Sequence, residues 1–417
     1  MCKKLLLLAF LFTLVFKPEF IFIPHSVNLF FGVIGLLMFF ARQRKAKYII
    51  EQSGVSIRTL IGYMIPFVIV SIISVLYNNT SDLYYPRYAI SLVLCFFGTY
   101  AFASLFYATY GEMSVEKLID YFVIAECVFL FIGLLSYFSP SIYDTLTRLQ
   151  KYDEIAETAM DRTVGSRLIS IGAQFFTASL INGFVLLLIG IRFYCYHMTV
   201  ANKVLYLLAY AYILIVGMMM GRTTAIGGAM GLLLIVFSLI RRGHGRIKSI
   251  TSVVMSIVLV LVIYMGFFAQ GRWDFDVLSE FGFEMFNNFK SGNGLTVHSN
   301  ERLWDMYNTI PNHLKTWLIG DAKWSEGDHY YMRVDAGYLR GLWYFGFVGL
   351  VALFWYYYKT VRYVVVDKCT FNGKKFLPMA LLGAYIIILN LKGPVDLFFY
   401  LMPFLFCNKR FSTLYVA

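Results

Sequence analysis

Apolar residues along the chain fall into blocks of roughly 18–22 residues that short polar segments separate. A helix of that length crosses the hydrocarbon core of a bilayer, which is about 30 Å thick. Backbone polar groups in lipid must be satisfied internally, so we expect helices and not the alternating strands of a porin-type barrel. We place the predicted spans near residues 4–22, 25–41, 58–77, 88–109, 119–138, 172–191, 203–220, 223–240, 249–268, 336–357, 376–391 and 395–407.

This pattern predicts an all-α, polytopic integral membrane protein with about twelve transmembrane helices. Residues 1–417 are expected to form a single integral-membrane domain. Two polar segments are too long to be simple connectors, 139–171 and the much longer 269–335. The first apolar block follows Lys3-Lys4 and fits either a signal peptide or a retained anchor. Because no small-residue cleavage site follows it, we expect an anchor.

Charge and composition fix the expected threading of these spans. The sequence is 59% hydrophobic and 14% charged, whereas soluble proteins average about 25% charged residues. With a cytoplasmic N-terminus, the short inner loops collect most basic residues, as the positive-inside rule requires, so the net charge of +12 indicates topology and not nucleic-acid binding. These residues are Arg42, Arg44, Lys45, Lys47, Arg241, Arg242, Arg246, Lys248, Lys359, Arg362, Lys368, Lys374, Lys375, Lys409 and Arg410. Both long polar segments then face away from the cytoplasm.

The sequence carries no recognisable cofactor motif. Its six cysteines are scattered and show neither zinc spacing nor a disulfide framework, and there is no nucleotide-binding loop. Asp274 and Asp276 have the spacing of a metal–nucleotide carboxylate pair, but two aspartates so spaced arise readily by chance. We therefore expect neither a metal nor another cofactor, and any chemistry must use an already activated substrate.

Two arginines lie where the outer membrane surface is predicted. Arg222 stands in the short turn between two apolar runs that are each near the minimum spanning length, and Arg167 directly precedes another span. A guanidinium at that depth is costly unless it faces a wet cavity or an anionic partner. Both residues also fit a plainer role as interface anchors whose side chains reach the surface.

The longest polar segment predicts a helix over His298 to Tyr307 that Ser299 or Asn300 would cap. His298 and Arg302 are four residues apart and therefore share one face, next to Glu301. A solvated amphipathic helix explains the same spacing. The segment ends at Asp335, where the next span begins and where a capping role alone explains an aspartate. Within the spans, Glu126 is either functional or hydrogen-bonded to a neighbouring helix.

With this arrangement the chain resembles the bacterial Wzy-type O-antigen polymerase family, in the O-antigen polymerase and ligase superfamily. The resemblance covers most of the chain and rests on short motifs in a fixed order. They are Arg167 before a span, Gly221-Arg222-Thr223-Thr224 between two spans, Arg302-Leu303-Trp304, Leu318-Ile319-Gly320, Asp335-Ala336-Gly337-Tyr338-Leu339-Arg340, and Trp343 to Gly349. Ligases carry a loop histidine close to the position of Asp335-Ala-Gly-Tyr338, so this departure favours a polymerase.

The resemblance implies a metal-independent glycosyltransferase of GT-C-like architecture in the bacterial inner membrane, with its active site facing the periplasm. The donor would be a glycan growing on undecaprenyl diphosphate, and the acceptor a single repeat unit on the same lipid. The acceptor hydroxyl attacks the anomeric carbon of the donor, and the lipid diphosphate leaves. Expected partners besides these substrates are membrane lipids and a chain-length-regulating co-polymerase, with no nucleic acid.

The residues suit these roles by their chemistry. Arginine pairs bidentately with phosphate oxygens, and fixed positive charge stabilises a departing diphosphate. A carboxylate or imidazole takes the acceptor proton. The candidate catalytic residues are Arg222, Arg302, Asp335 and His298, and the candidate substrate-binding residues are Arg167, Glu301, Trp304, Tyr338 and Arg340.

Three other functions stay open. A ligase would transfer the glycan to the lipid A core. A flippase for lipid-linked oligosaccharides should carry charges along a path through several spans, whereas this sequence is nearly free of charge there apart from Glu126. A non-catalytic scaffold would not need arginine at the depth of the lipid.

Overall fold

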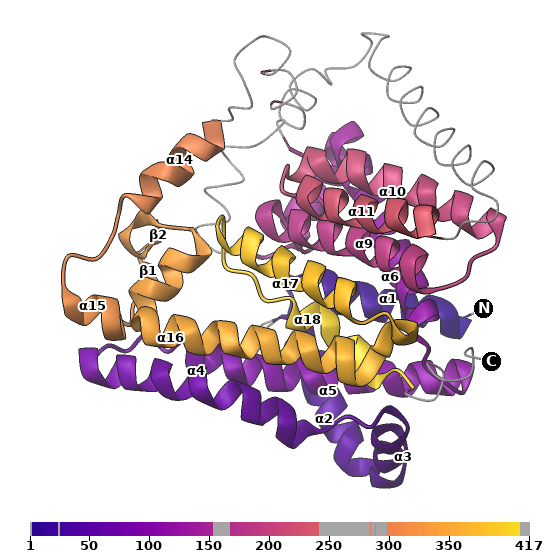
Figure 1. Cartoon of the computed structure of the whole chain (residues 1–417), viewed down its shortest axis with the longest axis horizontal. Coiled ribbons are helices and arrows are strands. Elements are labelled where there is room, and N and C mark those ends of the chain that lie inside the picture. The colour runs from indigo at the N-terminus through magenta and orange to yellow at the C-terminus, as the bar shows by residue number, and fades with distance from the viewer. Residues whose placement is uncertain are drawn as a thin grey trace.

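The computed structural model describes residues 2–23, 26–152, 167–241, 284, 288, 298–327 and 329–408. Side chains are not described at 241, 298–302 and 370. The described part is a bundle of helices with one two-stranded antiparallel hairpin (Figure 1). Helices α14 and α15 and the hairpin lie together at one end of the bundle.

The elements follow one another along the chain with few irregular connections. Up to residue 241 the helices are α1 (Cys2–Phe16), α2 (Val27–Ala41), α3 (Gln43–Ser53), α4 (Ile57–Asn78), α5 (Tyr84–Tyr110), α6 (Val115–Phe138), α7 (Pro140–Leu149), α9 (Phe175–Cys195), α10 (Val200–Met220) and α11 (Thr224–Arg241). After residue 297 come α14 (His298–Tyr307), α15 (Leu314–Ile319), β1 (Ser325–Glu326), β2 (His329–Tyr330), the short turn η1 (Tyr331–Arg333), α16 (Gly337–Arg362), the π-helical η2 (Tyr363–Cys369), η3 (Thr370–Gly373), α17 (Phe376–Asn390), α18 (Phe398–Leu401) and η4 (Met402–Phe406).

Six of the described helical segments are long and apolar enough to cross a membrane, and they are α4, α5, α6, α9, α10 and α16 with its continuation η2. The bent pair α2 and α3, with an angle of 104° between its halves, gives a seventh if it is one span. Helices α11 and α17 are shorter apolar helices. The prediction of a helical, multi-pass membrane protein is therefore confirmed. The number of twelve spans stays a prediction, and the span expected at 249–268 lies outside the described residues.

Two predicted spans are not the single helices that the sequence indicated. Helix α1 ends at Phe16 and has 15 residues, which at 1.5 Å per residue is shorter than the hydrocarbon core. Lys17 follows with a positive φ, and Pro18 continues the turn. The segment predicted at 395–407 instead forms the four-residue α18 and the 3₁₀ turn η4, which contains Pro403. A proline lacks the N–H that a continuous helix needs.

Close backbone contact holds the central helices together. Helix α9 packs along α10 and α11, α2 packs along α5, and α4 packs along α16. Between α9 and α11 the approach depends on glycine, because a Cβ on Gly227 would overlap the backbone of Gly183. One helical turn further on, a Cβ on Gly231 would overlap the backbone at Leu186. Small residues at such spacing let membrane helices approach closely.

The loops separate into two groups at opposite ends of the bundle. Tyr307 donates to the Leu391 carbonyl at 2.9 Å, at the end that carries α14, α15 and the hairpin, which we call the loop end. Asn408 donates through its backbone N–H to the Met113 carbonyl at 2.8 Å. Those residues lie at the other end, which we call the terminal end because α1 begins and the described chain finishes there (Figure 1). Loops predicted on one side of the membrane thus meet at one end.

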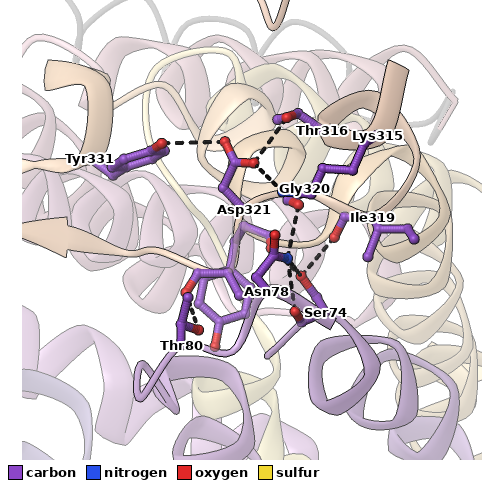
Figure 2. Close-up of polar contacts among 11 residues, drawn as sticks. Ser74, Asn78, Thr80, Lys315, Thr316, Ile319, Gly320, Asp321 and Tyr331 are labelled. Carbon is purple, nitrogen blue, oxygen red and sulfur yellow. Dashed lines mark hydrogen bonds and ion pairs between the residues drawn. The ribbon is translucent and has the colours of Figure 1, made fainter. Parts of the chain in front are cut away.

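The part of the long loop after α15 is tied to the bundle through α4. Figure 2 shows Ser74 within 2.7 Å of the Ile319 carbonyl and 2.8 Å of the Tyr344 carbonyl, and Asn78 donating to the Gly320 carbonyl at 3.1 Å. Asp321 accepts from Lys315 at 2.8 Å, from Thr316 at 2.9 Å and from Tyr331 at 3.3 Å. Polar groups at the loop end of α4 therefore fix the loop instead of facing lipid.

Two of the short sequence motifs pack directly against each other. Helix α16 is broken at Gly346, which has φ 69°. A Cβ on Gly346 would overlap the backbone of Leu318 and Ile319, and one on Gly320 would overlap the backbone of Tyr344 and Phe345. Beyond the turn, the backbone N–H of Asp321 donates to the Trp343 carbonyl at 2.7 Å. The Leu318–Gly320 turn thus fits into the break in α16.

Candidate functional site

Three basic side chains from separate loops gather at the loop end, and we call them the basic cluster. Arg167 precedes α9, Arg222 lies in the turn between α10 and α11, and Lys392 follows α17. Their charges act on one another, since the charge of Arg222 influences both Arg167 and Lys392. All three side chains are only partly exposed. The structure therefore brings together two arginines that are far apart in sequence and adds a lysine.

Local backbone contacts explain why Arg167 and Arg222 meet. The backbone N–H of Leu168 donates to the Met219 carbonyl at 3.3 Å, which places the strand-like segment before α9 beside the end of α10. The turn itself is compact, because the backbone N–H of Thr224 donates to the Gly221 carbonyl at 3.0 Å. Gly221 is required there, since a Cβ would meet the Ser179 side chain. The compact turn consequently leaves Arg222 little freedom to change its position.

Lys392 is positioned by the turn that follows α17. The side chain of Asn390 spans this turn, accepting from the Val395 N–H at 3.2 Å and donating to the Val395 carbonyl at 3.3 Å. The enclosed segment holds Lys392 and Gly393 next to the start of α16, because a Cβ on Gly337 would overlap the Gly393 carbonyl region. The turn thus holds Lys392 beside the start of α16.

Burial and like charge together raise the free energy of the cations in this cluster. Burial, and then the charge of Arg222, lower the pKa of Arg167 to about 10. Burial, and then Arg222 and Arg167, lower the pKa of Lys392 to about 8, while the carboxylate of Asp335 acts in the opposite direction. Burial lowers the pKa of Arg222 as well. A concentration of partly buried positive charge is the arrangement that binds a multivalent anion.

Acidic residues of the long loop approach the same cluster. Arg222 forms an ion pair with Glu284, and the two side chains are 16% and 28% exposed. Asp335 is exposed and lies near enough to Lys392 to influence it. An incoming phosphate group would therefore compete with a carboxylate for Arg222, while Asp335 remains at the edge of the cluster.

Helix α14 docks beside the basic cluster. Leu303, Met306 and Tyr307 pack on the start of α16, and the Tyr307 hydroxyl reaches the Leu391 carbonyl, one residue before Lys392. This backbone carries His298, Glu301 and Arg302, whose side chains lie outside the described part. The predicted helix is confirmed, but it begins at His298, so Ser299 and Asn300 lie inside it and neither is its cap. The roles of His298, Glu301 and Arg302 stay predictions.

The remaining predicted residues lie in different surroundings. Trp304 on α14 is 72% exposed. The Tyr338 hydroxyl donates to the Ile387 carbonyl at 2.9 Å, so it joins α16 to α17. Glu126 is fully buried, and the Asn182 amide donates to it when that amide is oriented to suit its neighbours. For Glu126 the hydrogen bond to a neighbouring helix is therefore the better explanation.

Arg340 belongs to a second feature of the loop end, a cavity of 830 Å³ that we call the aromatic cavity. Tyrosine is the commonest residue of its wall, which also holds one tryptophan and three charged side chains. The residues that define it are Lys17, Tyr84, Tyr85, Tyr88, Trp324, Tyr330, Arg340, Tyr357, Asp396 and Tyr400. Phe176 lines the cavity and also contacts Gly393, the neighbour of Lys392. The aromatic cavity therefore adjoins the basic cluster.

Inside the cavity a carboxylate is held by tyrosine hydroxyls. Asp396 accepts from the Tyr356 hydroxyl at 3.0 Å, from the Tyr88 hydroxyl, and from the Phe398 N–H at 2.7 Å. Lys17 acts electrostatically on this carboxylate, and its ammonium lies 3.5 Å from the centre of the Phe399 ring. The turn after α1 and the segment before α18 thus each contribute one charge.

Sequence reasoning missed Lys17, Lys392 and Asp396 as site residues. A usable signal existed for Lys392, because it lies in the three-residue segment 392–394 between the last two predicted spans, which is nearly as short as the segment that holds Arg222. Asp396 falls inside the predicted span 395–407, where a carboxylate is itself a signal. The argument that a cation pinned at the surface is costly applies equally to Lys392. For Lys17, the sequence Lys17-Pro18-Glu19 predicted a lumenal turn, and the structure confirms a turn at the end of α1, but the sequence gave no indication of a cavity beside that turn.

Among the described residues, no group of three or more histidine, cysteine, aspartate or glutamate side chains is placed to hold a metal ion. Asp274 and Asp276 lie outside the described part. The six cysteines are all free thiols. Metal independence therefore stays a prediction.

No protein-family model matches the chain, and no curated protein matches it either.

Proposed function

We propose that the protein is a membrane glycosyltransferase that polymerises lipid-linked repeat units of an O-antigen. The donor is a glycan on undecaprenyl diphosphate, and the acceptor is a repeat unit on the same lipid. The observation that carries the proposal is the convergence of Arg167, Arg222 and Lys392 at the loop end, beside the aromatic cavity. The working face lies in the periplasm, and the membrane is the bacterial inner membrane.

The basic cluster supplies the electrostatic part of the reaction. As the bond between the anomeric carbon and the phosphate oxygen breaks, negative charge grows on the lipid diphosphate. Fixed cations at that position stabilise the transition state more than the ground state, and this contribution is commonly the largest in catalysis. Arg222 provides a planar fork for two phosphate oxygens, whereas Lys392 provides a point charge.

The acceptor hydroxyl forms the new bond to the anomeric carbon and must lose its proton. Asp335, at the edge of the basic cluster, and His298 on α14 are the candidates to take it. Glu301 lies on the same helix as His298. The diphosphate leaves with the electron pair of the broken bond, so the step requires no oxidant and no further co-reactant.

The decisive experiment is deletion of the gene in a strain that makes a laddered lipopolysaccharide. A polymerase deletion leaves a single repeat on the lipid A core, whereas loss of a ligase or a flippase leaves none. Complementation with the wild-type chain should restore the ladder. A deletion strain with an unchanged ladder would remove the proposal altogether.

Purified protein gives the second arm of the test. In detergent with synthetic lipid-linked repeat units, the wild-type chain should form products with two or more repeats. An excess of a chelator should leave the rate unchanged, because the cations of the site are side chains. Inhibition by the chelator that Mg²⁺ or Mn²⁺ reverses would show that a metal, and not the basic cluster, neutralises the diphosphate.

A further inference from the structure

We propose that the aromatic cavity binds an acidic sugar, with the guanidinium of Arg340 pairing with the sugar carboxylate. The source of that sugar, a glycan on the lipid carrier, rests on the proposed function. The binding itself does not, because it follows from the chemistry of the cavity wall.

Arg340 is a buried side chain of the cavity wall whose guanidinium contacts two aromatic rings. Its side chain is 5% exposed, and its guanidinium carbon lies 3.3 Å from the centre of the Trp324 ring and 3.5 Å from the centre of the Tyr330 ring. Tyr84 stacks on the other face of Trp324, at 3.5 Å between ring centres and 11° between planes. The Trp324 and Tyr330 rings thus contact the guanidinium closely from two sides, and because their planes differ by 67° at most one of them lies flat against it.

The guanidinium retains donors for a ligand. One N–H group donates to the Trp324 carbonyl at 3.2 Å, and a guanidinium has five such groups. Donors in a fixed planar fork match a carboxylate, which accepts two parallel hydrogen bonds. The Trp324 carbonyl and the Tyr330 side chain take up part of this donor set, and the remaining N–H groups suit a planar carboxylate.

The charges that line the cavity also indicate an anionic ligand. Lys17 and Asp396 offset each other. Within the part of the chain that the structure describes, Arg340 forms no ion pair with a carboxylate. Asp82 lies behind the stack, where its side chain accepts the backbone N–H groups of Trp324 and Tyr84. One buried positive charge is left over, and burying a charge without a partner is costly. A ligand carboxylate supplies that partner.

The rest of the wall suits a sugar ring. Tyrosines present both an apolar ring face and a hydroxyl, which are the two features that carbohydrates use. The volume of 830 Å³ falls within the range of about 300–1,000 Å³ that is usual for small-molecule sites. Because Phe176 separates the cavity from Gly393 and Lys392, a sugar in the cavity is close to the place proposed for the diphosphate.

The test measures binding of simple glycosides to the purified full-length protein by saturation-transfer NMR. The probes are methyl glucuronide and methyl galacturonide, their carboxyl methyl esters, and galactose 6-phosphate. We expect both uronides to bind and the uncharged esters to bind about tenfold or more weaker, since a hydrogen bond to a charged group is lost. Equal binding of a uronide and its ester would overturn the proposal, and tighter binding of the sugar phosphate would overturn its carboxylate form.

Variants then locate the site. Arg340→Gln should abolish the difference between uronide and ester, and Arg340→Lys should recover only part of it. Arg333→Gln is the matched control, because Arg333 is an exposed arginine of the neighbouring turn η1. Preserved uronide preference in Arg340→Gln would overturn the assignment. If Arg340→Gln does not fold, the ester comparison on the wild-type protein still decides the outcome.

Sugar analysis separates this inference from the proposed function. If the deletion strain loses polymer and the wild-type polymer contains an acidic sugar, both stand. A polymer without any acidic sugar would overturn the inference and leave the polymerase intact. An unchanged ladder together with selective uronide binding would overturn the polymerase proposal and leave the inference about the cavity intact.

Discussion

At the scale of single residues, burial and pairing distinguish the arginine that we propose to act on the substrate from an arginine at the surface. Arg222 is held in a three-residue turn and is paired with Glu284. Arg148, by contrast, is an exposed side chain in the last turn of α7. A guanidinium costs little free energy at the exposed position of Arg148 and much more at the partly buried position of Arg222.

Replacing Arg222 with alanine should lower the polymerisation rate about 10²–10³-fold, the usual cost of removing one charge-stabilising donor. Arg222→Lys should fall in between, because lysine keeps the charge and loses the fork. We expect the same order for Arg302→Ala and Arg302→Lys. The measurement is the initial rate in membranes, normalised to protein amount by immunoblot.

Arg148→Ala is the control for the preceding series and should retain the wild-type rate. If Arg222→Ala and Arg302→Ala both make full-length polymer at normal protein levels, neither residue grips the diphosphate. Interface anchoring would then explain Arg222.

Lys392 should make substrate affinity depend on pH. Its pKa of about 8 means that it is mostly charged at pH 7 and loses its proton as the pH rises above 8. Because a bound diphosphate favours the charged form, affinity should be constant below pH 7 and fall above pH 8. KM for the lipid-linked donor should therefore rise between pH 7 and 9, and Lys392→Arg should remove that rise. A pH-independent KM in the wild-type protein would contradict the placement of Lys392 at the substrate.

How much of the site the sequence can disclose depends on whether a residue stands out from its local pattern. Arg222 does, because it interrupts two apolar runs. The turn at Lys17-Pro18-Glu19 is also visible in the sequence, but the cavity that Lys17 lines is not, because its wall comes from segments far apart in the chain. Arg340 was assigned to substrate by its motif, but its contact with Trp324 and Tyr330 depends on a hairpin of two-residue strands that no local pattern predicts.

At the scale of helices and turns, long apolar runs were predicted to within a few residues. The span expected at 58–77 is α4, Ile57–Asn78, and the one at 203–220 is α10, Val200–Met220. Length and hydropathy suffice there because a helix satisfies its own backbone. The segment at 395–407 is equally apolar, yet it folds as α18 and η4, buried inside the bundle. Protein neighbours there replace lipid, so hydropathy alone cannot distinguish the two cases.

The contact between α9 and α11 should be sensitive to added volume. Gly227→Val forces atoms into the Gly183 backbone, and such overpacking typically costs about 1–3 kcal/mol. We expect a lower midpoint of thermal unfolding in detergent and less protein in the membrane. Gly383→Ala on α17 is the control, because an added Cβ there meets nothing within 4 Å, and it should leave the midpoint unchanged or raise it. Equal behaviour of the two variants would contradict the close contact.

At the scale of the whole molecule, polar chemistry is concentrated at one end. The basic cluster, the aromatic cavity and α14 all lie at the loop end, whereas α3 and the π-helical η2 occupy the terminal end. A transporter needs polar groups along its path, and within the described spans the buried polar groups include Glu126 with Asn182 and, toward the terminal end, Arg192 paired with Glu116. The proposed enzyme would instead need its polar groups at the loop end alone, so the two functions differ in how they use these buried residues.

This asymmetry makes sidedness the central prediction for the whole molecule: the loop end is periplasmic and the terminal end is cytoplasmic. Ser325 on the hairpin and Glu51 on α3 are exposed at opposite ends. After Cys2, the exposed native cysteine, is changed to serine, Ser325→Cys should react with a membrane-impermeant maleimide in intact spheroplasts. Glu51→Cys should react only after the membrane is opened. Reporter fusions after Gly243 and Gly292 should likewise give opposite signals, since the positive-inside rule keeps the basic loop near Arg241 in the cytoplasm. Labelling of both cysteines from the same side would refute the threading, and labelling of Glu51→Cys alone in spheroplasts would invert it. An inverted threading would place the basic cluster on the cytoplasmic side, where it could not meet a periplasmic substrate.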